Sequence, residues 1–141
     1  MNSIPPDIYE RVQELALGIT NALEAGDEAL VDSLGETLRA YYEEQVAAGR
    51  SHPFLLESVA DFAQDPAEAA RLYELALQQS DAFPDEPKHT KMICLAEKLG
   101  ELGDYKRAKA CLRDGRLEAV RCADGFWIEE ADRLLKELGK R

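Results

Sequence analysis

Two carboxylates, Glu97 and Glu101, stand four residues apart in the chain, and this spacing places both on one face of a helix. Such a pair could hold a cation or act as a general acid and base. The two histidines lie far apart in the sequence, and the chain has no HExxH, no GxSxG and no phosphate-binding glycine loop. Helix-surface charge is therefore the better interpretation, and an enzyme that uses surface carboxylates is the least favoured function.

The cysteines and histidines indicate neither a metal site nor a bound cofactor. Cys94, Cys111 and Cys122 are an odd number with no CxxC pair, and only His52 and His89 could complete a metal-binding set. Cys94 and Cys111 fall among apolar neighbours in helical patterns, so we expect buried thiols rather than a nucleophile or metal ligands. Unpaired cysteines are typical of a reducing compartment, which favours a cytoplasmic protein.

A basic stripe, formed by Lys106, Lys109, Arg113 and Arg116, follows the spacing of one helix face. It could bind nucleic acid or an acidic partner. A solvated helix face is the favoured interpretation, because the apolar residues of the same segment already require an exposed opposite side. No aromatic residues alternate with the stripe to stack on bases, so RNA binding is not expected.

Composition and charge limit the class of partner. The 141 residues carry a net charge of -11, with 45% apolar and 32% charged residues. Residues 1–86 have a net charge of -14, whereas residues 87–141 have +3. This acidity argues against binding to duplex nucleic acid or to an anionic membrane. No apolar run approaches the ~20 residues of a membrane span, and no signal peptide is expected at the first residues.

Apolar periodicity predicts a single all-α domain of stacked antiparallel helical hairpins. The predicted units are hairpins at about 5–48, 52–80 and 88–121 and a capping helix at 125–139. Asp27, Asp65 and Asp104 break and cap helices at intervals of 38 and 39 residues, which indicates an internal repeat. Because one hairpin cannot cover its own apolar face, the three hairpins must stack.

Three smaller features carry predictions of their own. The apolar stripe of the first helix extends to Leu23, which predicts a buried face up to the end of that helix. Residues 80–87 (SDAFPDEP) hold two prolines and three acids and predict a loop. Gly115 interrupts the sixth helix at a position for a small packing residue, so we expect it to contact the capping helix closely.

The segment 91–112, KMICLAEKLGELGDYKRAKACL, resembles the tetratricopeptide repeat (TPR). The likeness lies in an apolar first helix with a small residue, the turn Gly103-Asp104-Tyr105, and small and apolar residues in the second helix; the helix residues are Leu95, Ala96, Leu99, Ala108 and Leu112. The second unit keeps Ala69, Tyr73 and Ala76, but Glu57 occupies a position for a small residue. The first unit keeps the turn Gly26-Asp27.

This resemblance implies a right-handed superhelix whose first helices line a concave groove for a peptide or a partner's helix. The groove residues that it implies are Ala16, Thr20, Glu24, Phe54, Ser58, Asp61, Thr90, Ile93, Glu97 and Glu101. Carboxylates beside Phe54 and Ile93 favour a basic, partly apolar partner.

The expected function is a non-catalytic protein–protein interaction module. Acidic proteins of this size act as inhibitors or immunity partners of basic toxins and nucleases, or as adaptors, and the acidic block of residues 1–86 suits such a partner. The alternative is a chaperone for a secreted protein, which would hold an unfolded segment through Phe54 and Ile93.

Overall fold

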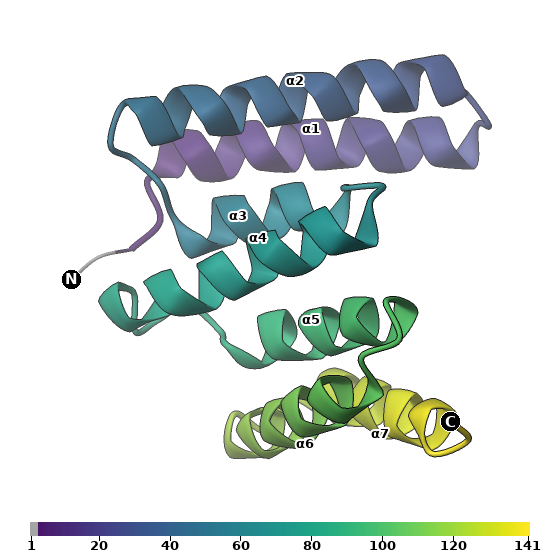
Figure 1. Ribbon diagram of the computed structural model, residues 1–141. Helices are drawn as coiled ribbons and strands as arrows, with labels where there is room; N and C mark the ends of the chain where they lie inside the picture. Colours follow the sequence, from purple (N-terminus) through teal and green to yellow (C-terminus); the bar gives the residue numbers. More distant parts are fainter. Residues whose placement is uncertain (1–2) are drawn as a thin grey trace.

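The computed structural model describes residues 3–141, which form helices and no strand (Figure 1). The elements are α1 (Pro6–Glu24), α2 (Glu28–Ala47), α3 (Pro53–Asp61), α4 (Pro66–Gln79), the 3-10 turn η1 (Ser80–Ala82), α5 (His89–Glu101), α6 (Tyr105–Arg121) and α7 (Gly125–Leu138). The all-α class is confirmed. Each helix pair falls within the range predicted for its hairpin. The segment 80–87 is not entirely irregular, because η1 continues from the end of α4.

Glycine–aspartate turns separate the helices of the first and third pairs. Gly26 and Gly103 have φ angles of 69° and 84°, a left-handed conformation that glycine adopts without the steric cost of a Cβ atom. The aspartates that follow, Asp27 and Asp104, each accept a hydrogen bond from the backbone N–H three residues ahead, at 3.1 and 3.3 Å. In each of these turns, the glycine therefore ends one helix and the aspartate caps the next.

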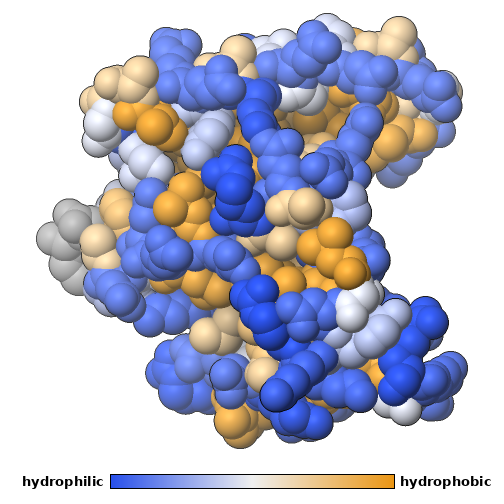
Figure 2. All heavy atoms as spheres, in the orientation of Figure 1, coloured by the Kyte–Doolittle hydropathy of each residue, from blue (hydrophilic) through white to orange (hydrophobic). Residues whose placement is uncertain are grey.

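Consecutive helices pack as antiparallel pairs, and the pairs follow one another in chain order (Figure 1). The pair α3–α4 lies between α1–α2 and α5–α6, and α7 packs against both α5 and α6. Their apolar faces meet in one core, whose large buried members include Ile8, Val12, Ile19, Leu38, Leu55, Leu56, Leu72, Tyr73, Ile93, Leu99 and Leu112. The outer surface is mostly hydrophilic, with apolar patches where helices of neighbouring pairs meet (Figure 2).

Gly115 of α6 lies tightly against α5. A Cβ atom at this position would lie 2.9 Å from Ile93 Cγ1 and 3.1 Å from Met92 Cβ. Both neighbours belong to α5, so the expectation that Gly115 packs against the capping helix is wrong. The glycine instead allows the two helices of the third pair to pack with their backbones close together.

A buried lysine connects the second and third pairs. Lys91, in α5, has no exposed side-chain surface. Its ammonium group donates to Glu57 Oε1 of α3 at 3.1 Å, to Glu86 Oε1 at 3.2 Å and to the Pro87 carbonyl at 2.8 Å. The other oxygen of Glu57 accepts from Thr90 Oγ1 at 2.7 Å. The residue that departs from the repeat pattern, Glu57, is thus the acceptor that holds α5 against α3.

Lys91→Met is expected to lower the free energy of unfolding by about 3 kcal/mol, because it leaves two half-buried carboxylates without the buried cation that they share. Chemical denaturation measures this change. The control Lys88→Met removes a half-exposed cation 3.3 Å from Asp81 and is expected to cost less than about 1 kcal/mol. Adding Glu57→Gln and Glu86→Gln to Lys91→Met should restore part of the stability. Equal effects of Lys91→Met and Lys88→Met would contradict the assigned role.

Gly115→Ala is expected to destabilise the protein by about 1–2 kcal/mol, since the overlap with α5 outweighs the higher helix propensity of alanine. The control is Gly35→Ala in α2, where a Cβ atom would meet nothing within 4 Å. That change should stabilise the protein by up to about 1 kcal/mol. Thermal unfolding of the two variants measures both changes in stability. A stabilising effect of Gly115→Ala would show that α5 and α6 can move apart at little cost.

Candidate functional site

The first helix pair is longer than the second. The helices α1 and α2 have 19 and 20 residues, whereas α3 and α4 have 9 and 14. At 1.5 Å per residue, α1 exceeds α3 by about 15 Å. The end of the first pair that carries the α1–α2 turn therefore extends beyond the second pair (Figure 1). Part of the apolar face of α1 and α2 has no helix to cover it.

A cleft of about 610 Å³ lies at this step, between α1–α2 and the turn from α3 to α4. Its floor is apolar and includes Leu23, Val31 and Phe62, with Ile19 buried beneath. Leu23 is 58% exposed, so the prediction that it belongs to the buried face of α1 is wrong. The second pair ends too early to cover it.

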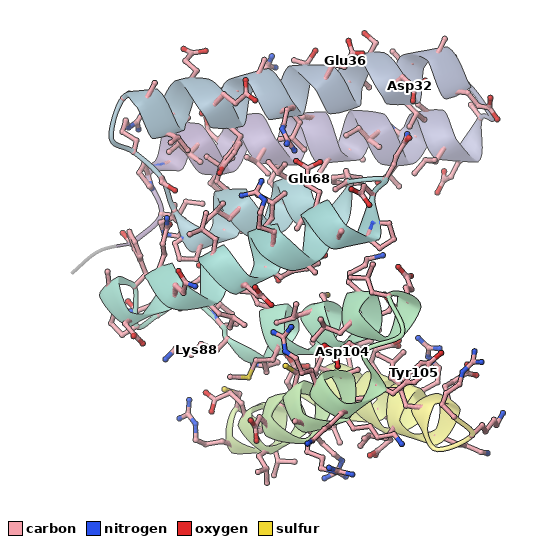
Figure 3. The ribbon with its side chains drawn as sticks, viewed as in Figure 1. Asp32, Glu36, Glu68, Lys88, Asp104 and Tyr105 are labelled. Carbon is pink, nitrogen blue, oxygen red and sulfur yellow. The ribbon has the colours of Figure 1, made fainter. Side chains whose placement is uncertain are left out.

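The rim of the cleft is acidic. Asp32 and Glu36 come from α2 and Glu68 from α4 (Figure 3), and Asp61 comes from the end of α3. The cleft has one lining cation, Arg39, which forms an ion pair with Glu68.

Two rim carboxylates are not neutralised. Asp32 accepts a hydrogen bond from the uncharged amide of Gln64 at 3.3 Å. The Glu36 carboxylate has no hydrogen-bond or ion-pair partner among residues 3–141. With Arg39 engaged by Glu68, the rim keeps an excess of negative charge beside an exposed apolar floor.

Asp61 connects the cleft to the core. Its Oδ1 atom accepts a hydrogen bond from the Tyr73 hydroxyl at 2.5 Å. The residue is exposed, yet protein surrounds its carboxylate on several sides, and this desolvation raises its pKa to about 6. The negative charge of Glu57 acts in the same direction, whereas the Tyr73 hydrogen bond and Lys91 lower the pKa.

The predicted groove residues separate into exposed and buried sets. Thr20, Glu24, Asp61, Glu97 and Glu101 are exposed, and Ala16, Phe54 and Thr90 are half-buried, whereas Ser58 and Ile93 are buried.

The two buried residues do not fit a contact role. The Ser58 hydroxyl donates to the Phe54 carbonyl at 2.8 Å, and Ile93 packs beneath Gly115. We therefore correct the groove by removing Ser58 and Ile93. Of the predicted residues, Asp61 lines the cleft.

The two carboxylates of α5, Glu97 and Glu101, each lie near a different cation. Glu97 lies 3.9 Å from Arg133 of α7, and Glu101 lies 3.4 Å from Lys98. In residues 3–141 no group of three or more histidine, cysteine or acidic side chains is arranged to hold a metal ion. These contacts favour a structural role for Glu97 and Glu101.

The histidines and thiols also have structural surroundings. His52 accepts from the Phe54 N–H at 3.0 Å, and burial lowers its pKa. His89 lies 2.8 Å from Asp124, at the start of α7. Burial raises the pKa of Cys94 to about 12, which keeps the thiol protonated and weakly nucleophilic. Cys94 is half-buried rather than fully buried.

Sequence reasoning missed Asp32, Glu36 and Glu68 as site residues. All three belong to second helices or lie near a turn, and the TPR resemblance directs attention to first helices. The available signal was the unequal length of the predicted hairpins, 5–48 against 52–80, which leaves one end of the longer pair uncovered.

The comparisons with protein-family models, with curated proteins and with solved structures found no match to this chain. Over the range that the structure describes, no helix combines the length and the apolar character that crossing a bilayer requires. The interpretation of the cleft therefore depends on its own geometry and charge.

The Asp61 carboxyl is expected to titrate with a midpoint near 6, against an ordinary value of 3.8. An aspartate whose pKa is raised by folding holds its proton more tightly in the folded state. Its contribution to stability is therefore greatest at low pH and is lost as the pH rises through about 6. Carboxyl carbon shifts in an NMR titration measure the midpoint.

Tyr73→Phe provides the matched variant for this titration. It removes a hydrogen bond that favours the charged carboxylate, so the midpoint should move further upward. In Asp61→Asn, the fall of stability with rising pH should become less steep. A wild-type midpoint near 3.8 would show that the carboxylate is well solvated.

Proposed function

We propose that this protein is a non-catalytic interaction module whose acidic cleft binds a basic, partly apolar segment of another protein. The observation that carries the proposal is the exposed apolar floor at Leu23 beneath the carboxylates of Asp32 and Glu36. Apolar surface gains free energy when a partner removes it from water. The rim adds attraction for lysine and arginine and repels acidic segments.

Contacts between neighbouring pairs support a TPR-like superhelix as the framework. Rings of Tyr9 in α1 and Phe54 in α3 lie 5.6 Å apart. Glu57 of α3 bonds to α5, and Arg133 of α7 approaches α5 at Glu97. Successive first helices and the capping helix thus form one row.

The second helices support the same arrangement. Arg107 of α6 donates to Glu74 of α4 at 2.7 Å, and the two residues are 33 positions apart. The bond between Thr90 and Glu57 spans the same interval. This separation of 33 residues is close to the ~34-residue period of the TPR family. The capping aspartates Asp27, Asp65 and Asp104 are spaced more widely, at 38 and 39 residues.

The dimensions of the cleft suit a few side chains of a partner rather than a complete domain. Its volume lies in the range of pockets that bury a small ligand, roughly 300–1,000 Å³. A helix or extended segment with one or two apolar side chains between cations fits this description. The surplus charge of the rim would also speed the encounter with such a partner at low ionic strength.

We propose that, by binding a partner through this cleft, the protein acts as an inhibitor, an immunity protein or an adaptor. The chaperone alternative loses one of its two contact residues, because Ile93 is buried. Enzymatic use of Glu97 and Glu101 has no support from their geometry, since each carboxylate faces its own cation.

Asp32→Lys/Glu36→Lys is expected to weaken binding of a fluorescent amphipathic peptide of leucine and lysine by at least about tenfold, measured by anisotropy at low salt. The control Glu10→Lys/Glu44→Lys makes the same change in net charge at exposed positions outside the cleft. It should change the affinity much less. Equal losses in both variants would show that only net charge matters.

Leu23→Asp separates the apolar floor from the acidic rim. The substitution adds a negative charge, so electrostatics alone would strengthen binding of the cationic peptide. The proposal predicts weaker binding, because the partner's apolar side chains lose their contact surface. Thermal unfolding of each variant confirms that it remains folded.

A further inference from the structure

The outward face of α6 carries cations that the fold does not use. The side chains of Lys106, Lys109 and Arg113 have no ion-pair or hydrogen-bond partner among residues 3–141. The other arginines of the helix are engaged. Arg107 bonds to Glu74, and Arg116 bonds to Asp132 of α7 at 2.6 Å.

Apolar side chains continue the same face toward the end of α6. Leu117 is 69% exposed and Val120 is 49% exposed. The steps from Lys106 through Lys109, Arg113 and Leu117 to Val120 are three or four residues, so all five side chains share one stripe of the helix. The face therefore combines cations with two exposed aliphatic side chains, a surface suited to a partner that is both acidic and apolar.

The chemistry of this stripe is complementary to that of the cleft. The stripe offers three free cations followed by two apolar side chains. The cleft offers unneutralised carboxylates beside an exposed apolar floor. Opposite charge and matching apolar surface are the conditions that favour docking of one on the other.

The two surfaces cannot meet within one chain. The cleft lies between the first and second helix pairs, and α6 belongs to the third pair, at the other end of the molecule (Figure 1). Two copies can bring them together. Nucleic acid is a poorer candidate for the stripe, because the chain is acidic overall and the stripe has no aromatic side chain for base stacking.

We propose that the α6 stripe of one copy occupies the acidic cleft of a second copy, so that the protein associates head to tail. This inference rests on the proposed function, because it names a basic, partly apolar occupant for that cleft. Such a contact uses two different surfaces and does not close on itself, so mass should grow with concentration rather than stop at a dimer.

Sedimentation velocity over a wide concentration range tests the proposal with two variants of the full chain. Asp32→Lys/Glu36→Lys reverses two charges of the cleft rim, and Lys109→Glu/Arg113→Glu reverses two charges of the stripe. Each alone should remain monomeric, with self-association weakened at least about tenfold. Mixed together, they should associate again, because each supplies the surface that the other lacks.

The control Lys136→Glu/Lys140→Glu reverses two exposed cations outside the stripe and should associate like the wild type. A wild type that stays monomeric at every concentration, or two variants that fail to associate when mixed, would overturn the proposal. Self-association that persists in the cleft variant alone would also overturn it, because the contact would then lie elsewhere.

The same variants separate this inference from the proposed function. Lys109→Glu/Arg113→Glu leaves the cleft intact, so the leucine–lysine peptide should bind it as tightly as it binds the wild type. Peptide binding by a wild type that does not self-associate would overturn the head-to-tail contact and keep the cleft as a binding site. A wild type that neither binds the peptide nor self-associates would overturn the proposed function and the head-to-tail contact together.

Discussion

Lys91 has no access to solvent, and acceptors from two other parts of the chain surround its ammonium group. Glu57 approaches from α3 and Glu86 from the segment before α5, so the second and third helix pairs and their connection are tied at one point. Burying these charges is costly, and an apolar cluster of similar volume could be as stable. We attribute the advantage to position, since the acceptors fix how α5 lies on α3.

Among residues 3–141, the first helix pair has no buried ion pair with the second; its ion pair with α4, Arg39–Glu68, is partly exposed at the cleft. Its packing against α3 is much less extensive than that between the second and third pairs. The contacts that cross to the second pair include the Tyr9–Phe54 rings and the bond from Gln64 to Asp32. The cleft lies at this less tightly packed junction, where the long α1 and α2 extend beyond shorter helices. The proposed binding surface and the less extensive packing beside it therefore share one cause, the unequal length of adjacent hairpins.

Much of the fold follows from local signals, whereas the site depends on contacts between distant residues. Asp27 and Asp104 cap helices because a carboxylate next to a left-handed glycine satisfies free N–H groups, and a sequence displays both residues together. The pairing of Lys91 with Glu57 joins residues 34 positions apart, and no local pattern indicates it. Ile93 follows the groove register of the resemblance, but close approach of α6 at Gly115 buries it. The exposure of Leu23 depends on where the helices of the second pair end.

In the function that we propose, the apolar floor and the acidic rim of the cleft act together as one binding site. The most direct measurement is a map of backbone amide shifts in the wild-type protein as the leucine–lysine peptide is added. The largest changes should fall on residues around Leu23, Val31 and Phe62, on both sides of the cleft. Changes spread evenly over the acidic surface of residues 1–86, with none concentrated at these positions, would contradict it.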